Sequence, residues 1–150
     1  MVKSAFILLA CSLFLSGMAH GKEDRWYNLT EDADLTYYID RKSVLKTPDN
    51  THIFWVKIVS RKKEYLKKEY KLSDLEYVLF NYEIDCGRGM YKTRGTIFFD
   101  KNGKQIDKQT PTYVDMSDAE PIPPESVMEL AQDAVCPDSG TDDGLPAAEQ

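Results

Sequence analysis

The segment YVLFNYEIDC, residues 77–86, decides the fold. Large apolar side chains recur at every second position, which is the period of a β-strand. One face of this strand carries the apolar series and the second cysteine of the chain: Val78, Phe80, Tyr82, Ile84 and Cys86. Asn81, Glu83 and Asp85 lie on the opposite face. The alternation therefore directs Cys86 toward the core side of a sheet, beside aromatic rings.

Other segments show the same period on both sides of this strand. They are Leu35–Asp40, His52–Val59, Met90–Phe99 and the polar Gln105–Gln109. In His52–Val59 both faces carry large apolar groups, which predicts a central strand covered at least partly on both sides. Asp100–Gly103 has the composition of a hairpin turn, and Gly95 within Met90–Phe99 is a candidate β-bulge. Trp26–Thr30 is expected only to lead into the first strand.

A short helix is predicted after the proline-rich residues 120–124. Ser126 and Glu129 fit a capping box, in which the serine accepts from the backbone and the glutamate reaches back. The expected apolar stripe is Val127, Leu130, Ala131 and Ala134, widened by Met128 and Val135. Pro137 ends the helix. About nine residues cannot stay helical alone in water, so the helix must dock on the sheet.

The first 21 residues are typical of a secretory signal peptide. Lys3 precedes an apolar run over residues 5–15, and small residues follow at 17–21. The run is shorter than the roughly 20 residues of a membrane span, and no later segment reaches that length. The alternative is a lipid anchor through Cys11, although cleavage there would leave a very short signal. We therefore predict that the chain is exported and has no transmembrane span.

The cysteine count becomes even once the leader is removed. Cys86 and Cys136 remain, 50 positions apart, and such a pair in an oxidising compartment indicates a disulfide. It would fasten the helix end to the strand bearing Cys86. The alternative is a nucleophilic thiol, for which His52 is the only histidine beyond the leader able to act as base. No second cluster of Cys or His has the spacing of a metal site, and no metal or other cofactor is predicted.

Composition and charge limit the remaining functions. The 150-residue chain has a net charge of −6, which becomes −7 when Lys3 is lost with the leader. A negative chain argues against nucleic acid as the main partner. Residues 137–150 are small, polar and acidic, and we predict that they form a disordered tail.

A basic segment, residues 61–71, contrasts with this charge. It holds six basic and two acidic residues, a net charge of +4. We consider it a candidate binding patch for an anionic surface or an acidic protein face, made of Arg61, Lys62, Lys63, Tyr65, Lys67, Lys68, Tyr70 and Lys71. The alternative is a solvated connector between two strands, formed as a short helix or a hairpin.

Three further features have a structural and a functional interpretation. Glu83 and Asp85 share a strand face and could act as an acid–base pair, but a solvated strand face explains them better, because no pocket-forming motif accompanies them. His52 fits a strand residue near a turn better than a ligand or base. Trp55 fits packing in the sheet or a dimer interface better than a ligand platform. The sequence shows no catalytic constellation, and we predict no enzyme.

Five segments in this order resemble the surface-adhesin protein E family of bacterial envelope proteins. They are Tyr37–Asp40 with Ser43-Val44, Phe54–Lys57, Tyr82–Cys86, Phe98–Asp100 with Gly103, and Glu120–Val127 with the final cysteine. The resemblance covers roughly residues 26–136 and makes 22–136 one domain. The namesake group is lipid-anchored, whereas Cys11 is poorly placed for lipid attachment in this chain. The acidic tail is also not part of the family pattern.

The resemblance implies an α+β fold with an antiparallel sheet of about six strands. A C-terminal helix would lie across one face, tethered by the disulfide, and the resemblance allows a homodimer. The namesake is an adhesin for host proteins such as vitronectin and laminin. The expected function is a non-enzymatic binding module of the envelope, an adhesin for host or matrix proteins. The alternative is a periplasmic structural or accessory protein that acts through a dimer or partner interface.

Overall fold

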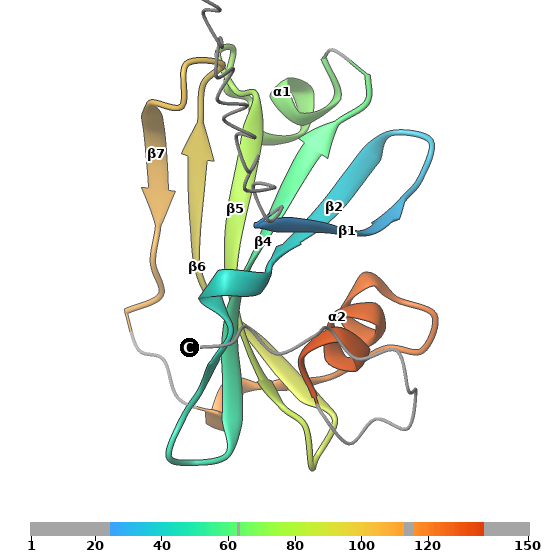
Figure 1. The fold of residues 1–150 in the computed structure, drawn as a ribbon. Coiled ribbons are helices and arrows are strands. Elements are labelled where there is room, and N and C mark those ends of the chain that lie inside the picture. Colours follow the sequence, from blue (N-terminus) through green and yellow to red (C-terminus); the bar gives the residue numbers. More distant parts are fainter. Residues whose placement is uncertain (1–24, 63, 113–115, 137–150) are drawn as a thin grey trace, which may run out of the picture.

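The computed structural model describes residues 25–62, 64–112 and 116–136 (Figure 1). The predicted leader with its Cys11 and the predicted acidic tail lie outside these residues. The described residues form eight strands: β1 (Trp26–Glu31), β2 (Leu35–Asp40), β3 (Leu45–Lys46), β4 (Thr51–Ser60), β5 (Tyr77–Asp85), β6 (Met90–Phe99), β7 (Gln105–Gln109) and β8 (Glu120–Pro121). The helices are α1 (Tyr65–Tyr70) and α2 (Val127–Val135), with short 3₁₀ turns η1 (Arg41–Ser43) and η2 (Met116–Asp118).

All strands belong to one antiparallel sheet. Its main path has the order β1-β2-β4-β5-β6-β7, and the two-residue strands β3 and β8 pair with β4 and β6. The predicted α+β class, with about six strands and a C-terminal helix, is confirmed. In β4, the neighbour of β2 and β5, the side chains of Phe54 and Val56 on one face are buried, whereas Ile53 and Trp55 on the other are only partly covered. The prediction of partial cover on both sides holds.

The N-terminal segment forms more structure than its sequence indicates. Residues 26–31 are an edge strand paired with β2, and Leu29 lies where the register shifts between Asn28 and Thr30. This irregularity hides the two-residue period, so the segment appears only to lead into β2. Leu29 nevertheless packs against the core.

A bulge in β6 allows both of its halves to face the core. Asn81 pairs with Gly95, whereas the next residue, Tyr82, pairs with Thr93, so Arg94 is the extra residue. The bulge predicted at Gly95 is therefore present, and its extra residue is the preceding one, Arg94. Because one inserted residue reverses the alternation, Tyr91 and Phe98 lie on the same face despite an odd spacing.

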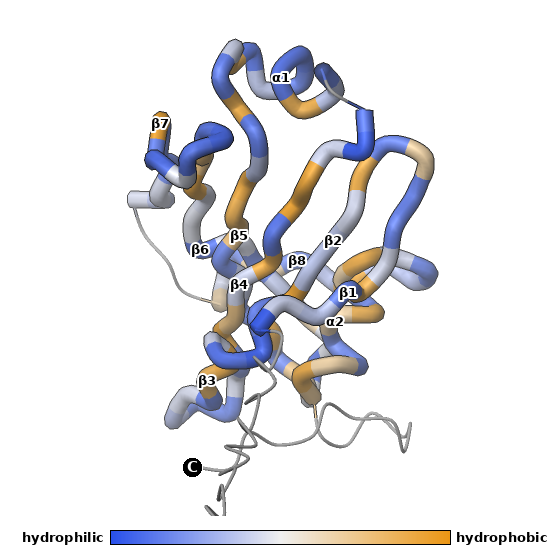
Figure 2. The backbone as a smooth tube through the Cα atoms, turned by 45° about the horizontal axis from the view of Figure 1, so that its top comes forward, coloured by the Kyte–Doolittle hydropathy of each residue, from blue (hydrophilic) through white to orange (hydrophobic). Residues whose placement is uncertain are grey.

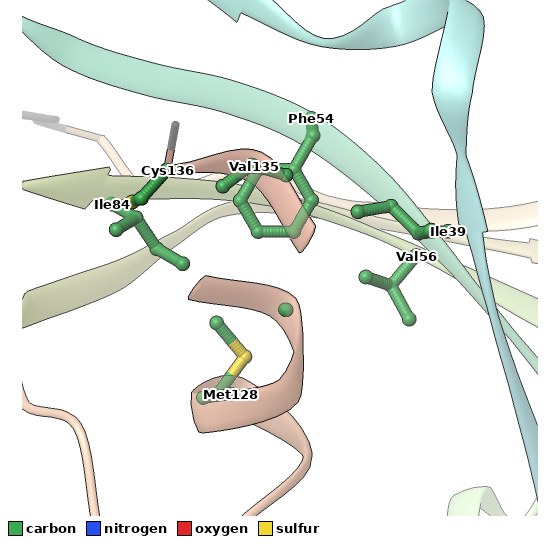
Figure 3. Close-up of a cluster of buried hydrophobic side chains, with 8 residues drawn as sticks. Ile39, Phe54, Val56, Ile84, Met128, Val135 and Cys136 are labelled. Atoms are coloured by element: carbon green, nitrogen blue, oxygen red, sulfur yellow. The ribbon is translucent and has the colours of Figure 1, made fainter. Parts of the chain in front are cut away.

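Both helices cover the same face of the sheet, at opposite ends (Figures 1 and 2). Around α2 the buried cluster contains Ile39, Phe54, Val56, Ile84, Met128, Ala131, Val135 and Cys136 (Figure 3). Around α1 it contains Leu66, Leu75, Val78 and Phe98. Ile58 packs against both clusters and joins them. Neither helix covers the opposite face.

The capped start of α2 is confirmed, but its buried face differs from the predicted one. The Ser126 hydroxyl accepts from the backbone N–H of Glu129 at 3.2 Å. The Glu129 carboxylate, in turn, accepts from Glu125 at 2.7 Å rather than from Ser126. The buried residues are Met128, Ala131 and Val135, whereas Leu130 is 41% exposed. The apolar residues form a wide arc on this helix, so the docking partner decides which part is buried.

Candidate functional site

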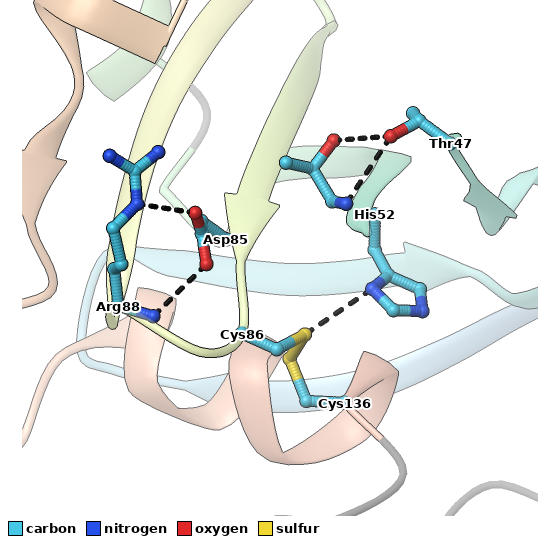
Figure 4. The surroundings of a disulfide bond; sticks show 7 residues. Thr47, His52, Asp85, Cys86, Arg88 and Cys136 are labelled. Carbon is cyan, nitrogen blue, oxygen red and sulfur yellow. Dashed lines mark hydrogen bonds and ion pairs between the residues drawn. A yellow bond between two sulfur atoms is a disulfide. The ribbon is translucent and has the colours of Figure 1, made fainter. Parts of the chain in front are cut away.

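The predicted disulfide is present between Cys86 and Cys136 (Figure 4). Cys86 follows directly after β5, and Cys136 is the residue that ends α2. Their Cα atoms lie 5.8 Å apart, which is the usual separation for a disulfide. The backbone N–H of Cys136 still donates to the carbonyl of Gln132 at 2.8 Å, so the last helical turn continues into the tether.

His52 lies next to this disulfide. Its Nδ1 atom is 3.3 Å from Cys86 Sγ, and the residue is only 7% exposed (Figure 4). Burial, reinforced by the charge of Lys46, lowers the pKa of His52, so the imidazole is neutral at pH 7. The structure thus joins the histidine and the cysteine that the sequence offered as a nucleophile and its base. The Cys86 sulfur is already bonded to Cys136 and is not a thiolate.

A polar pocket lies between the turn after β3, the ends of β4 and β5, and η2. Its volume is about 420 Å³, and its lining residues are Thr47, Asp49, Thr51, Glu83, Asp85, Arg88, Arg94 and Met116. The two carboxylates singled out in the sequence thus face a concave site. The sequence contains no pocket-forming motif because three separate segments build it.

Both of these carboxylates have cationic partners. Glu83 accepts from Thr51 Oγ1 at 2.6 Å and pairs with Arg94 at 3.1 Å. Asp85 pairs with Arg88 at 2.5 Å, and this hydrogen bond lowers the pKa of Asp85. An acid–base pair requires one carboxyl to hold its proton near neutral pH. The arrangement around Asp85 favours the ionised form instead.

The basic segment folds around α1 as a short helix, one of the connectors considered for it. Leu66 is buried, and the ring of Tyr70 packs edge-on against Phe98 at 5.1 Å. Tyr70 therefore belongs to the core rather than to a binding surface. Tyr65, Lys68 and Lys71 are exposed. We call these three residues the α1 surface.

Part of the positive charge of residues 61–71 is paired with carboxylates of the β1–β2 hairpin. Arg61 pairs with Glu31 at 2.9 Å, and Lys62 pairs with Asp34. The hydrogen bond from Lys62 to Asp34 raises the pKa of this lysine. Within the helix itself, Lys67 and Glu64 are 3.4 Å apart.

Part of the candidate patch therefore remains exposed and without ion pairs among the described residues. Lys68 and Lys71 form no ion pair with any other described residue. Lys63 lies outside the described residues.

The face of the sheet opposite the helices carries half-buried apolar and aromatic side chains. Trp55, Leu79 and Ile97 belong to the three neighbouring strands β4, β5 and β6. Lys57 lies 4.4 Å from the ring centre of Trp26 and 5.1 Å from that of Tyr38, so its charge is held over two aromatic rings. Trp55 is half-buried on this open face, a position that both its packing and its ligand-platform interpretations allow.

A comparison of the chain with protein families supports one assignment. Within the described residues, no helix has the length and apolar character needed to cross a membrane. No curated protein and no solved structure matches the chain. A family model described as surface-adhesin protein E matches residues 26–137, which include every strand, both helices and the disulfide. The chain belongs to the surface-adhesin protein E family.

Proposed function

We propose that this chain is an exported, non-enzymatic binding module of the bacterial envelope that adheres to host or matrix proteins. The family match over residues 26–137 supports the adhesin role. The proposed organisation is a leader over residues 1–21, a folded domain over 22–136 and an acidic tail over 137–150. A mature chain of this kind would reach the periplasm or the cell surface.

The α1 surface is the proposed contact region. Leu66 and Tyr70 anchor the helix to the sheet. Tyr65, Lys68 and Lys71 are exposed on the solvent side of the helix. The single observation that carries this choice is that Lys68 and Lys71 have no ion-pair partner among the described residues. Their charge is available to an acidic protein face or an anionic surface. Tyr65 adds an aromatic ring with a hydroxyl, a combination enriched at protein interfaces.

A local positive surface on a negative protein gives a specific electrostatic signature. The net charge of the whole chain is −6 and repels an anionic partner, whereas the α1 surface attracts it. Attraction between exposed charges is screened by salt over about 8–10 Å at physiological ionic strength. Binding through the α1 surface should therefore weaken as salt is added.

The experiment compares two charge reversals of equal size. The disulfide-bonded chain is passed over immobilised laminin and vitronectin at low and at physiological salt. Lys68→Glu with Lys71→Glu should reduce affinity about tenfold, corresponding to about 1.4 kcal/mol. Lys101→Glu with Lys104→Glu, at exposed positions of the β6–β7 turn, is the matched control and should have a small effect. Equal losses in both variants would remove the α1 surface as the contact region.

The non-enzymatic assignment is supported by the chemistry around the candidate catalytic groups. Cys86 is bonded to Cys136, and Asp85 is paired with Arg88. Neither is in the state that a nucleophile or a general acid requires at neutral pH. Turnover of a peptide or ester substrate by the purified chain would contradict the assignment.

The uncovered face of the sheet favours a second function, that of a periplasmic accessory protein with a dimer or partner interface. Leu79 pairs with Ile97 on that face, and Trp55 lies diagonally across from Leu79, so the face carries half-buried apolar side chains on three strands. Antibody or protease access on intact cells separates the two functions, because an adhesin must be reachable from outside. The accessory role would be supported if the protein were protected from protease and antibody on intact cells. It would also require an envelope partner whose binding is lost in the Trp55→Arg variant.

A further inference from the structure

Three metal-ligating side chains meet at the junction of β4, β5 and α2. The Nδ1 or Nε2 atom of His52 and the sulfur atoms of Cys86 and Cys136 all lie within 4.8 Å of one another. The three residues come from segments far apart in the chain, so only the fold assembles them. His52 and Cys136 are buried, at 7% and 5% exposure, and Cys86 is half-buried. Cys136 belongs to the packed core around α2, and Cys86 packs against that core.

We propose that, when its disulfide is reduced, this cluster binds one Zn²⁺ ion through Cys86, Cys136 and His52. Two thiolates and one imidazole are the ligand types that zinc prefers in proteins. A fourth position remains for water or an exogenous ligand. The disulfide and the metal are mutually exclusive, because each sulfur is either bonded to the other sulfur or coordinated to zinc.

The distances are close to those a zinc ion needs. Zn–S bonds of about 2.3 Å and Zn–N bonds of about 2.0–2.1 Å at tetrahedral angles place sulfur and nitrogen roughly 3.6 Å apart. His52 Nδ1 and Cys86 Sγ are already 3.3 Å apart. The same geometry requires roughly 3.8 Å between the two sulfurs. Since the Cα atoms of the cysteines are 5.8 Å apart, small side-chain rotations supply this separation without moving the backbone far.

The chemistry balances in two steps. A dithiol reductant gives two electrons and two protons to the Cys86–Cys136 bond, yielding two thiols, and is itself oxidised to a disulfide. Zn²⁺ then replaces the two thiol protons, which are released to solvent, and the neutral imidazole of His52 coordinates through a lone pair. The same dithiol state exists in any newly made chain before oxidation. Zinc would therefore compete with disulfide formation at this position.

The core around the cluster favours binding in the folded state. Ile84 and Val135 neighbour the two cysteines, and together with Phe54 they form the apolar wall seen in Figure 3. An apolar surrounding limits water at the site and strengthens interactions with the ion. Metal binding would thus hold the end of α2 on the sheet in the reduced chain, as the disulfide does in the oxidised chain.

The test uses Co²⁺ as a spectroscopic substitute for Zn²⁺ on the full chain. The protein is reduced with a phosphine, which neither binds the metal tightly nor leaves a competing thiol. We expect a one-to-one cobalt complex with a thiolate-to-metal charge-transfer band, which added Zn²⁺ abolishes. The oxidised chain at the same pH should show no such band. Absence of the band in the reduced chain would overturn the proposal.

Two substitutions at one position distinguish the site from non-specific thiol binding. His52→Gln should weaken cobalt binding at least about tenfold, since even loss of a supporting residue commonly costs that much. His52→Cys should restore binding, because it returns a soft ligand to the same place. Circular dichroism of the oxidised variants checks that both are folded. Unchanged affinity in His52→Gln would show that the cysteines bind metal without the assembled site, and the proposal would fail.

Discussion

The two helices cover the same face of one sheet but are held there differently. α2 has nine residues, a serine cap, three buried side chains and a covalent bond at its end. α1 has six residues, no side-chain cap and one buried side chain, Leu66. Its flanking residues Arg61 and Lys62 are held to the β1–β2 hairpin by exposed ion pairs, which contribute little.

This difference separates a covalently fixed end of the molecule from the end that we propose as the contact region. The α2 end concentrates the burial and the covalent constraint that a domain of this size needs. The α1 end leaves charged and aromatic groups in solvent, and these exposed residues, unlike Leu66, can change without loss of buried contacts. This separation suits the proposed function, because an adhesin has to bind a partner while its fold stays intact.

The largest expected effect comes from removing the tether. Cys86→Ala with Cys136→Ala should lower the free energy of unfolding by about 4 kcal/mol, because the bond closes a loop with a sequence separation of 50 residues. Urea denaturation of the variant and the oxidised parent measures the difference. A loss below about 1 kcal/mol would mean that α2 is held by packing alone.

The next effect compares one anchor from each helix. Leu66→Ala should cost about 2–3 kcal/mol, because it empties the α1 cluster of a residue that is only 3% exposed. Met128→Ala, at 8% exposure, should cost less, since the tether keeps α2 docked around the smaller side chain. The same denaturation experiment ranks them. The reverse order would show that α1 depends less on its buried contact than we infer.

A smaller effect compares the helix starts. Ser126→Ala should cost about 1 kcal/mol, because it removes the acceptor for the N–H of Glu129. Glu64→Ala at the start of α1 should change stability by less than about 0.5 kcal/mol, because Glu64 makes no side-chain cap bond. Thermal melts of the two variants provide the comparison. Similar losses would indicate that the two helix starts are equally structured.

The smallest effect concerns the hairpin that pairs with the basic segment. Asp32 accepts backbone N–H groups from Asp34 and Leu35, both at 2.7 Å, and these hydrogen bonds lower its pKa. The folded state thus binds fewer protons, so this stabilisation is present above about pH 4 and is lost as pH falls through the lowered pKa. Asp32→Asn should flatten that part of the stability–pH curve. If the stability of the variant fell at low pH as steeply as that of the parent, the role assigned to Asp32 would be contradicted.

Much of the architecture follows from local sequence patterns. The bounds of β7 and the start of α2 match the prediction because alternation, turn residues and a capping serine act within a few positions. The disulfide follows from the count of cysteines beyond the predicted leader. These signals are short-range, so one sequence is enough to show them.

The candidate sites were harder to predict because they depend on contacts between distant segments. His52 and Cys86 are 34 positions apart, and Arg61 meets Glu31 across 30 positions. Arg88 is only three positions from Asp85, but Arg94 meets Glu83 across the β5–β6 hairpin, and the rest of the polar pocket comes from other segments. Only the pairing of Thr51 with Asp85 and His52 with Ile84 brings these segments together.

Hydrogen exchange measured by mass spectrometry with and without a phosphine reductant tests the central contrast most directly. Reduction should speed exchange in α2 and in the paired ends of β4 and β5, while exchange in α1 stays unchanged, because only the former depend on the Cys86–Cys136 bond. Equal acceleration at both ends of the sheet, or none at α2, would contradict the division between a covalently fixed end and a contact end.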